Sequence, residues 1–280
     1  MPHLPIAGRQ VHYEVDDFTK PWLSPETLLI QHGMCRNTRF WRDWPPALAT
    51  DWRIIRRDLP GHGDSPAPPP SYVWRLEDLV SETVQFLDAL KLERVHLLGE
   101  STGGMLAMMF AAQHPERLHS LILCASPTTI APAAQAFFAA GHADWQTAIQ
   151  TLGTREWGRW LISQTGTAGS LSEAQREWVI EQIARIPAHV LVGYSRMVSG
   201  TDVGSLLERI RTPTLILSPT KSAATPPSQQ DALAAGIRGA ERVVIDGSGH
   251  EIYADRAEAC CAAVREFLRG MKRHGQIRPQ

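Results

Sequence analysis

Short apolar runs alternate with longer amphipathic stretches along most of the chain. Over 76–90, apolar side chains recur every three or four residues, which is typical of a helix with one buried face, and 255–267 repeats that pattern near the end of the chain. Alternation of this kind predicts an α/β fold with a mostly parallel, doubly wound sheet and helices on both faces. The runs with the length and apolar character of buried strands are 27–31, 52–56, 94–99, 120–125, 213–218 and 242–246.

Residues 128–205 interrupt this alternation, because they are helical in composition and hold few strand-like runs. We interpret them as a helical cap over the carboxyl edge of the sheet, with 1–127 and 206–280 forming the core. The alternative is that these helices belong to one undivided core. Four of the nine tryptophans fall in this segment, and for each of them packing is favoured over contact with a substrate. These four are Trp145, Trp157, Trp160 and Trp178.

Composition narrows the possible partners. The chain has 280 residues and a net charge of −1, so no charged field favours nucleic acid, and 43% hydrophobic with 20% charged residues is ordinary for a soluble globular protein. No segment has the length and apolarity to span a membrane, and the N-terminus lacks the charged and apolar parts of a signal segment. The four cysteines lack metal-ligand spacing, so we expect reduced thiols in a cytoplasmic protein, with no metal and no cofactor.

The sequence Gly99-Glu100-Ser101-Thr102-Gly103 lies where an apolar run ends and a helical run begins. A sharp strand-to-helix turn of this pattern pushes its central serine into a strained, exposed position that only small neighbours allow. The same turn places the backbone N–H of Thr102 and the positive end of the helix beside any oxyanion formed at Ser101. We therefore predict that Ser101 is a catalytic nucleophile.

A second candidate is His250, which follows an apolar run and a turn that contains Gly247 and Gly249. Because the pKa of a serine hydroxyl lies far above neutrality, Ser101 needs a base within hydrogen-bond reach, and a histidine supplies one near physiological pH. Functional residues of parallel sheets gather at the carboxyl ends of the strands, where both side chains are expected. Another histidine, His62, is interpreted as a structural turn residue.

A third turn, His32-Gly33-Met34-Cys35, follows the first of the six apolar runs. We expect the His-Gly pair to aim the backbone N–H of Met34 at the same point as that of Thr102. Two converging donors of this kind make an oxyanion hole. His32 is expected to shape the loop behind that hole, and Gly33 and Cys35 are candidate contacts for the substrate.

Taken together, these features resemble the α/β-hydrolase fold over nearly the whole chain. The shared segments, in the family's order and spacing, are His32-Gly33, 58–65, the Ser101 turn, 213–217 and Gly249-His250. The resemblance implies that Ser101 is the nucleophile, His250 the base, and Met34 and Thr102 the oxyanion donors.

The departure from the family concerns the acidic residue that normally fixes the histidine tautomer and stabilises the imidazolium. At the two places where the family carries this acid, our alignment puts Ser222 and Ala125. Either Ser222 or Ser126 orients His250, or a carboxylate from elsewhere reaches it, or the chain is a Ser–His dyad with reduced turnover. The carboxylates considered, each favoured as a structural or solvent-facing charge, are Asp202, Glu100 and Glu251.

The predicted function is hydrolysis of a carboxylic ester or lactone. Ser101 would form an acyl-enzyme that water, activated by His250, then hydrolyses, and the aromatic content of the predicted cap favours a small, largely apolar substrate. The loops at 33–35 and 124–128 are similar to those of zearalenone-type lactonases and cofactor-free dioxygenases, more than to haloalkane dehalogenases. The alternatives are a carbon–carbon bond hydrolase, a cofactor-independent dioxygenase, or a non-catalytic ligand-binding descendant. The sequence indicates neither the substrate's identity nor the oligomeric state.

Overall fold

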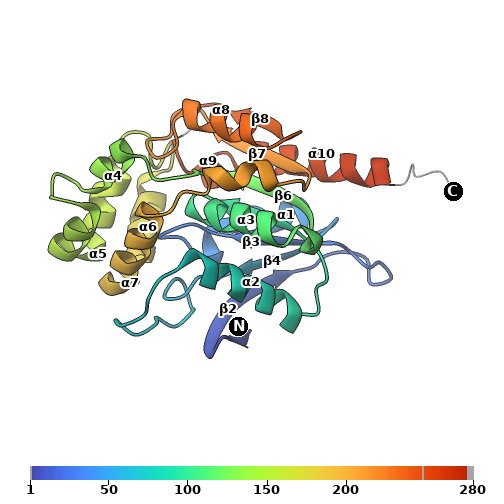
Figure 1. The fold of residues 1–280 in the computed structure, drawn as a ribbon, viewed down its shortest axis with the longest axis horizontal. Coiled ribbons are helices and arrows are strands. Elements are labelled where there is room, and N and C mark those ends of the chain that lie inside the picture. The colour runs from blue at the N-terminus through green and yellow to red at the C-terminus, as the bar shows by residue number, and fades with distance from the viewer. Residues whose placement is uncertain (1, 248, 276–280) are drawn as a thin grey trace.

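A central sheet organises the computed structural model, which describes residues 2–247 and 249–275 (Figure 1). Within these residues the sheet has eight strands in the order β1-β2-β4-β3-β5-β6-β7-β8. Ser248 of the predicted histidine turn and the end of the predicted second core segment lie outside the described residues. The strands are β1 (His3–Ile6), β2 (Arg9–Asp16), β3 (Thr27–Gln31), β4 (Arg53–Arg57), β5 (Val95–Glu100), β6 (Leu118–Cys124), β7 (Thr214–Pro219) and β8 (Glu241–Ile245).

The six predicted strands are present as β3 to β8, and every pairing among these six strands is parallel. This arrangement confirms the predicted α/β class with a mostly parallel sheet. The first two strands were not predicted: β1 pairs with β2, and β2 with β4, both antiparallel. In β2 only Val11 and His12 are fully buried, so the strand lacks the apolar run that marks the others.

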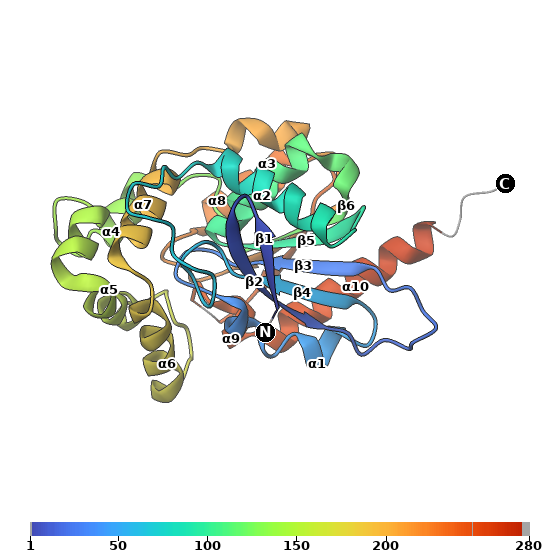
Figure 2. The ribbon, with the colours of Figure 1, turned by 90° about the horizontal axis from the view of Figure 1, so that it is seen from below.

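Helices cover both faces of the sheet, with α2 and α3 on one side and α1 and α10 on the other (Figure 2). Apolar residues and glycines make up most of α3, and all but its last residue are buried. The helices predicted over 76–90 and 255–267 are confirmed as α2 and α10, although a short helix, α9, precedes α10. The core helices are α1 (Pro45–Leu48), α2 (Leu76–Ala89), α3 (Thr102–Gln113), α8 (Pro227–Gly236), α9 (Ile252–Asp255) and α10 (Ala257–Gly275).

Four further helices, which we call the inserted helices, lie between β6 and β7 in the chain and gather at one end of the molecule (Figures 1 and 2). Because β6 and β7 are neighbours in the sheet, the chain leaves and returns at the same place, where Thr129 and Asp202 form an isolated antiparallel bridge. The division into a core and a separate cap stays a prediction. The inserted helices are α4 (Pro132–Phe138), α5 (Trp145–Ser163), α6 (Glu173–Ala184) and α7 (Ala188–Ser199).

Buried apolar side chains form one cluster that extends from the sheet into the inserted helices, with Leu97, Phe110 and Trp157 among its members. Burial of this apolar surface is the main favourable term that holds the two parts together. The four cysteines are buried and form no disulfide bonds. In the described part of the chain, every helix is too short or too polar to cross a bilayer.

Candidate active site

Ser101 lies in the tight turn between β5 and α3, where its backbone adopts φ 51° and ψ −126°. A positive φ is uncommon for a residue with a Cβ and marks local strain. A Cβ on Gly99 would lie 2.6 Å from the carbonyl oxygen of Gly103, and one on Gly103 would lie 2.6 Å from that of His32. These close approaches require glycine on both sides of Ser101 and let the strand turn directly into the helix.

His250 reaches Ser101 from the turn that follows β8. Its Nε2 lies 2.9 Å from Ser101 Oγ, across a sequence separation of 149 residues. The loop between α5 and α6 fixes the turn, because the His250 N–H donates to the carbonyl oxygens of Thr167 at 2.9 Å and Gly166 at 3.1 Å. A Cβ on Gly249 would lie 2.6 Å from Thr167 O, so the residue before the histidine must be small. The two predicted residues are therefore brought together.

The other ring nitrogen of His250 meets a serine at the place where the family carries an acid. Nδ1 lies 2.9 Å from Ser222 Oγ, in the loop that follows β7. The same oxygen accepts hydrogen bonds from Thr225 N–H and Thr225 Oγ1, each at 2.9 Å, and from Ala224 N–H at 3.2 Å. A serine oxygen has two lone pairs, so these donors outnumber its acceptor sites. A carboxylate at this place would accept from the same donors and would also carry a negative charge, whereas the Ser222 hydroxyl is neutral.

Two of the other residues considered for orienting His250 have different partners. Ser126 Oγ donates to Gly99 O at 3.1 Å, behind the Ser101 turn, instead of bonding to the imidazole. Asp202 accepts from the N–H of Gly204 at 2.7 Å, at the base of the inserted helices. Neither residue orients the histidine in this structure.

The two remaining carboxylates both border the site. Glu251 is buried, and its carboxylate forms an ion pair with Arg36 and accepts a hydrogen bond from the Tyr253 hydroxyl. Glu100 is 1% exposed, and its Oε1 lies 3.8 Å from His250 Nε2, on the side of the ring that faces Ser101. Of the two alternatives given for Glu100 and Glu251, a structural or a solvent-facing charge, the solvent-facing one does not apply, because both side chains are buried in the wall of the pocket.

The residues predicted to form an oxyanion hole also meet. The Met34 N–H donates to Thr102 Oγ1 at 2.9 Å, and this hydroxyl lies 3.2 Å from the Tyr194 hydroxyl of α7. An oxyanion that used the Met34 donor would therefore replace the Thr102 hydroxyl. Gly33 is not among the residues that line the pocket in the described chain. Its N–H donates to Glu100 Oε2 at 2.8 Å, behind the pocket wall.

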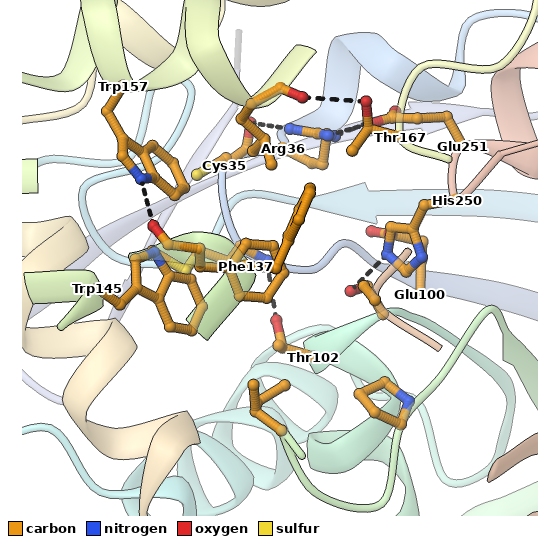
Figure 3. A pocket seen from close by; sticks show the side chains of 17 residues that line it. Cys35, Arg36, Glu100, Thr102, Phe137, Trp145, Trp157, Thr167, His250 and Glu251 are labelled. Atoms are coloured by element: carbon orange, nitrogen blue, oxygen red, sulfur yellow. Dashed lines mark hydrogen bonds and ion pairs between the residues drawn. The ribbon is translucent and has the colours of Figure 1, made fainter. Parts of the chain in front are cut away.

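A largely apolar pocket opens in front of Ser101 and His250, between the sheet edge and the inserted helices (Figure 3). Cys35 lines it, and its contact with a substrate stays a prediction. Trp145 and Trp157 also line it and pack against each other. Trp160 is not among the described lining residues and packs against one of them, Phe137. The apolar wall is formed by Ile130, Phe137, Phe138, Trp145, Trp157 and Leu161.

Burial shifts the pKa values of both titratable groups beside Ser101. Burial lowers the pKa of His250 to about 4, while Glu251 nearby raises it and Arg36 lowers it further. A neutral imidazole is therefore available as a proton acceptor at physiological pH. Burial raises the pKa of Glu100 to about 7, although Arg36 and the Gly33 N–H hold it down. Among the described residues, no group of three or more His, Cys, Asp or Glu side chains could hold a metal ion.

Some lining residues could not be identified from sequence. Phe137 and Phe138 lie in a helical stretch without a distinguishing motif, and only the fold places them opposite Ser101. Glu100 was visible inside the glycine-serine pattern. The signal that distinguishes it is its position as the last residue of β5, whose six residues are all buried.

The fold and the site together identify the class of protein. The family model for the alpha/beta hydrolase fold matches residues 26–257, and the chain belongs to this family. Among solved structures, the enol-lactonase from Burkholderia xenovorans LB400 matches with a TM-score of 0.78 at 23% identity, covering 95% of this chain and 99% of that one. MGS-M2, an alpha/beta hydrolase enzyme from a Medee basin deep-sea metagenome library, matches with a TM-score of 0.84 at 19% identity, covering 100% and 99%. At these identities the likeness is one of fold.

Two curated relatives resemble the chain in sequence. The Pimeloyl-(acyl-carrier protein) methyl ester esterase of Neisseria meningitidis serogroup C is 28% identical over 263 residues, which is 86% of this chain and 92% of the relative. The Poly(3-hydroxyalkanoate) depolymerase of Ectopseudomonas oleovorans is 29% identical over 266 residues, which is 93% of this chain and 90% of the relative.

Proposed function

We propose that this protein is a serine hydrolase that cleaves carboxylic ester or lactone bonds of small, largely apolar molecules. The observation that carries the proposal is the 2.9 Å contact between His250 Nε2 and Ser101 Oγ at the floor of an apolar pocket. A hydroxyl at a strained turn becomes a useful nucleophile only when a base can take its proton. The relatives named as a methyl ester esterase and a depolymerase support the same reaction class.

The proposed reaction has two halves. In the first, Ser101 Oγ attacks the substrate carbonyl, its proton moves to His250 Nε2, and the backbone N–H groups of Met34 and Thr102 stabilise the oxyanion. The proton then passes from the imidazolium to the departing alcohol oxygen, which leaves an acyl group on Ser101. In the second half, water replaces the alcohol and the same transfers run again.

The Met34 donor needs a local rearrangement in this scheme. In the unliganded site it bonds to Thr102 Oγ1, so the substrate oxygen must displace that hydroxyl. The Thr102 hydroxyl already lies beside the Tyr194 hydroxyl and can turn fully toward it. We infer that the inserted helices act as a cap, because they supply Tyr194, whose hydroxyl lies beside that of Thr102, and the aromatic side chains of the pocket wall.

A pre-steady-state assay with p-nitrophenyl esters of several acyl lengths tests the proposal. We expect the wild-type protein to release p-nitrophenol faster than the background, and Ser101→Ala to fall to the background rate. Ser163→Ala, which removes an exposed hydroxyl on α5, is the matched control and should keep full activity. Equal rates for wild type and Ser101→Ala on every ester would contradict the proposal and favour a ligand-binding protein.

A further inference from the structure

The carboxyl group of Glu100 lies on the reactive side of His250. Glu100 ends β5 and immediately precedes Ser101, so its backbone position is set by the same strained turn. Its Oε2 accepts the Gly33 N–H at 2.8 Å, which fixes the side chain, and its Oε1 lies 3.8 Å from His250 Nε2. Figure 3 shows Glu100 beside the His250 ring at the floor of the pocket.

A negative charge on this side of the ring would stabilise the imidazolium that forms during the reaction. When His250 takes the Ser101 proton, the imidazole becomes a cation, and a nearby negative charge stabilises it. Ser222 contacts Nδ1 but is neutral. Glu251, the other buried carboxylate of the pocket wall, also raises the pKa of His250, but it is already paired with Arg36 and Tyr253. Among the described residues, Glu100 is the one acid within 4.0 Å of a His250 ring nitrogen.

We propose that Glu100 supplies, from the Nε2 side of His250, the negative charge that Ser222 cannot supply from the Nδ1 side. Glu100 is then a positioning residue that acts through His250, and the inference rests on the proposed function. No proton moves to Glu100 in the step. The Ser101 proton goes to Nε2 and later to the departing oxygen, while the Glu100 carboxylate stays ionised and lowers the energy of the imidazolium between the two transfers.

The surroundings of Glu100 decide at which pH this charge is present. Burial raises its pKa to about 7, with Glu251 acting in the same direction and Arg36 in the opposite one. The carboxylate therefore predominates above pH 7 in the free protein. The titratable and charged groups that face Glu100 are Cys35, Arg36, Cys124, Tyr194, His250, Glu251 and Tyr253.

The test is the pH profile of kcat/KM for p-nitrophenyl acetate, which reports the ionisations of the free enzyme. For wild type we expect kcat/KM to rise with pH through a limb near 7 and then level off. Glu100→Gln keeps the shape of the side chain and an oxygen for the Gly33 N–H but removes the charge. We expect this variant to lose the limb near 7, to retain only a rise near the pKa of about 4 of His250, and to level off roughly ten- to a hundredfold lower. The loss should fall on kcat and leave KM within about twofold.

Two controls separate this role from a general effect of the substitution. Glu82→Gln removes another buried carboxylate, which pairs with Arg9 away from the pocket, and should keep the wild-type profile. Ser222→Asp places a carboxylate among the donors on the Nδ1 side. We expect it to raise kcat by a larger factor in the Glu100→Gln background than in wild type, because only there does His250 lack the carboxylate that lies within 4.0 Å of a ring nitrogen.

The outcomes distinguish the inference from the function on which it rests. If wild type does not exceed Ser101→Ala at any pH, the proposed hydrolase and this inference both fail. If wild type is active and Glu100→Gln retains the limb near pH 7, the limb belongs to another group and only the inference fails. An equal gain from Ser222→Asp in both backgrounds also contradicts it.

Discussion

The two ring nitrogens of His250 face different surroundings: a hydroxyl and a carboxyl group lie near Nε2, and a hydroxyl alone contacts Nδ1. On the Nε2 side, Ser101 and Glu100 come from the end of β5. A Cβ on Gly99 or Gly103 would lie less than 3.0 Å from backbone atoms there, and φ at Ser101 is positive, so the chain has little freedom. On the Nδ1 side, Ser222 and Thr225 belong to the loop after β7, and a neutral hydroxyl occupies the place of the family's acid. The side that does the chemistry keeps the family pattern, while the side that orients the base departs from it.

This difference bears on the tautomer of His250. To accept the Ser101 proton, Nε2 must be unprotonated, so Nδ1 must carry the hydrogen and donate it to Ser222 Oγ. The donors from Thr225 already compete for that oxygen. Ser222 can instead donate its own hydrogen to Nδ1, which leaves the hydrogen on Nε2 and blocks proton transfer. A serine permits both arrangements, whereas a carboxylate enforces the productive one.

The largest effect should come from removing the base on the Nε2 side. We expect His250→Ala to lower kcat for p-nitrophenyl esters by roughly 10⁴-fold or more, since nucleophile and base act as one unit. The double variant with Ser101→Ala should be no worse than either single one. His114→Ala, at a partly exposed helix end, is the control and should retain wild-type kcat. A loss below about tenfold for His250→Ala would contradict the assigned role of this base.

Placing a carboxylate beside Nδ1 of His250 should raise the hydrolytic activity. We expect Ser222→Asp to increase kcat of the wild-type background by about tenfold, because the carboxylate accepts from Nδ1–H and the neighbouring donors together. Ser222→Ala should lower kcat, and ¹⁵N chemical shifts of the imidazole should report the change in tautomer. A fall in kcat for a folded Ser222→Asp variant would show that the loop does not tolerate an acid there.

The negative charge of Glu100, on the Nε2 side, should lower the stability of the folded protein. Burial raises the pKa of Glu100 to about 7, from 4.5 as its ordinary value. A group whose pKa is raised by folding contributes its full stability below the unfolded value, and that contribution is lost as pH rises through 7. Glutamine has no such dependence. We therefore expect urea unfolding to show Glu100→Gln more stable than wild type at pH 8 by on the order of 3 kcal/mol, with the gap closing toward pH 4.

The smallest effect should come from removing one of the hydrogen-bond donors to Ser222 Oγ. Thr225→Val keeps the shape of the side chain and the backbone N–H but removes one hydroxyl that bonds to Ser222 Oγ. With fewer competitors, Nδ1–H should donate to Ser222 more often, so we expect kcat to rise by less than about fivefold while stability falls by about 1 kcal/mol. Steady-state kinetics together with a urea titration measure both quantities. A marked fall in kcat would contradict this account of the competition.

The sequence predicts the parts of the molecule that depend on strong local constraints. The apolar runs of β3 to β8 are recognisable because buried parallel strands exclude polar residues. The Ser101 turn is recognisable because its backbone tolerates only glycine two residues before and two residues after the serine. The strand β2 escapes notice because only two of its residues are fully buried. Phe137 escapes functional interpretation for a different reason: its place in the pocket depends on which distant segments the fold packs against it. For the same reason Glu100 was considered for His250 but could not be distinguished from the other two carboxylates.

Labelling by a fluorophosphonate tests the central claim most directly, because the probe reacts only with a hydroxyl that a base activates. Intact-mass and peptide mass spectrometry locate the adduct, and the time course gives its rate. The account predicts one adduct on the peptide that contains Ser101 in wild type, none in Ser101→Ala, and a rate lower by about a thousandfold or more in His250→Ala. Equal labelling of wild type and Ser101→Ala would contradict it.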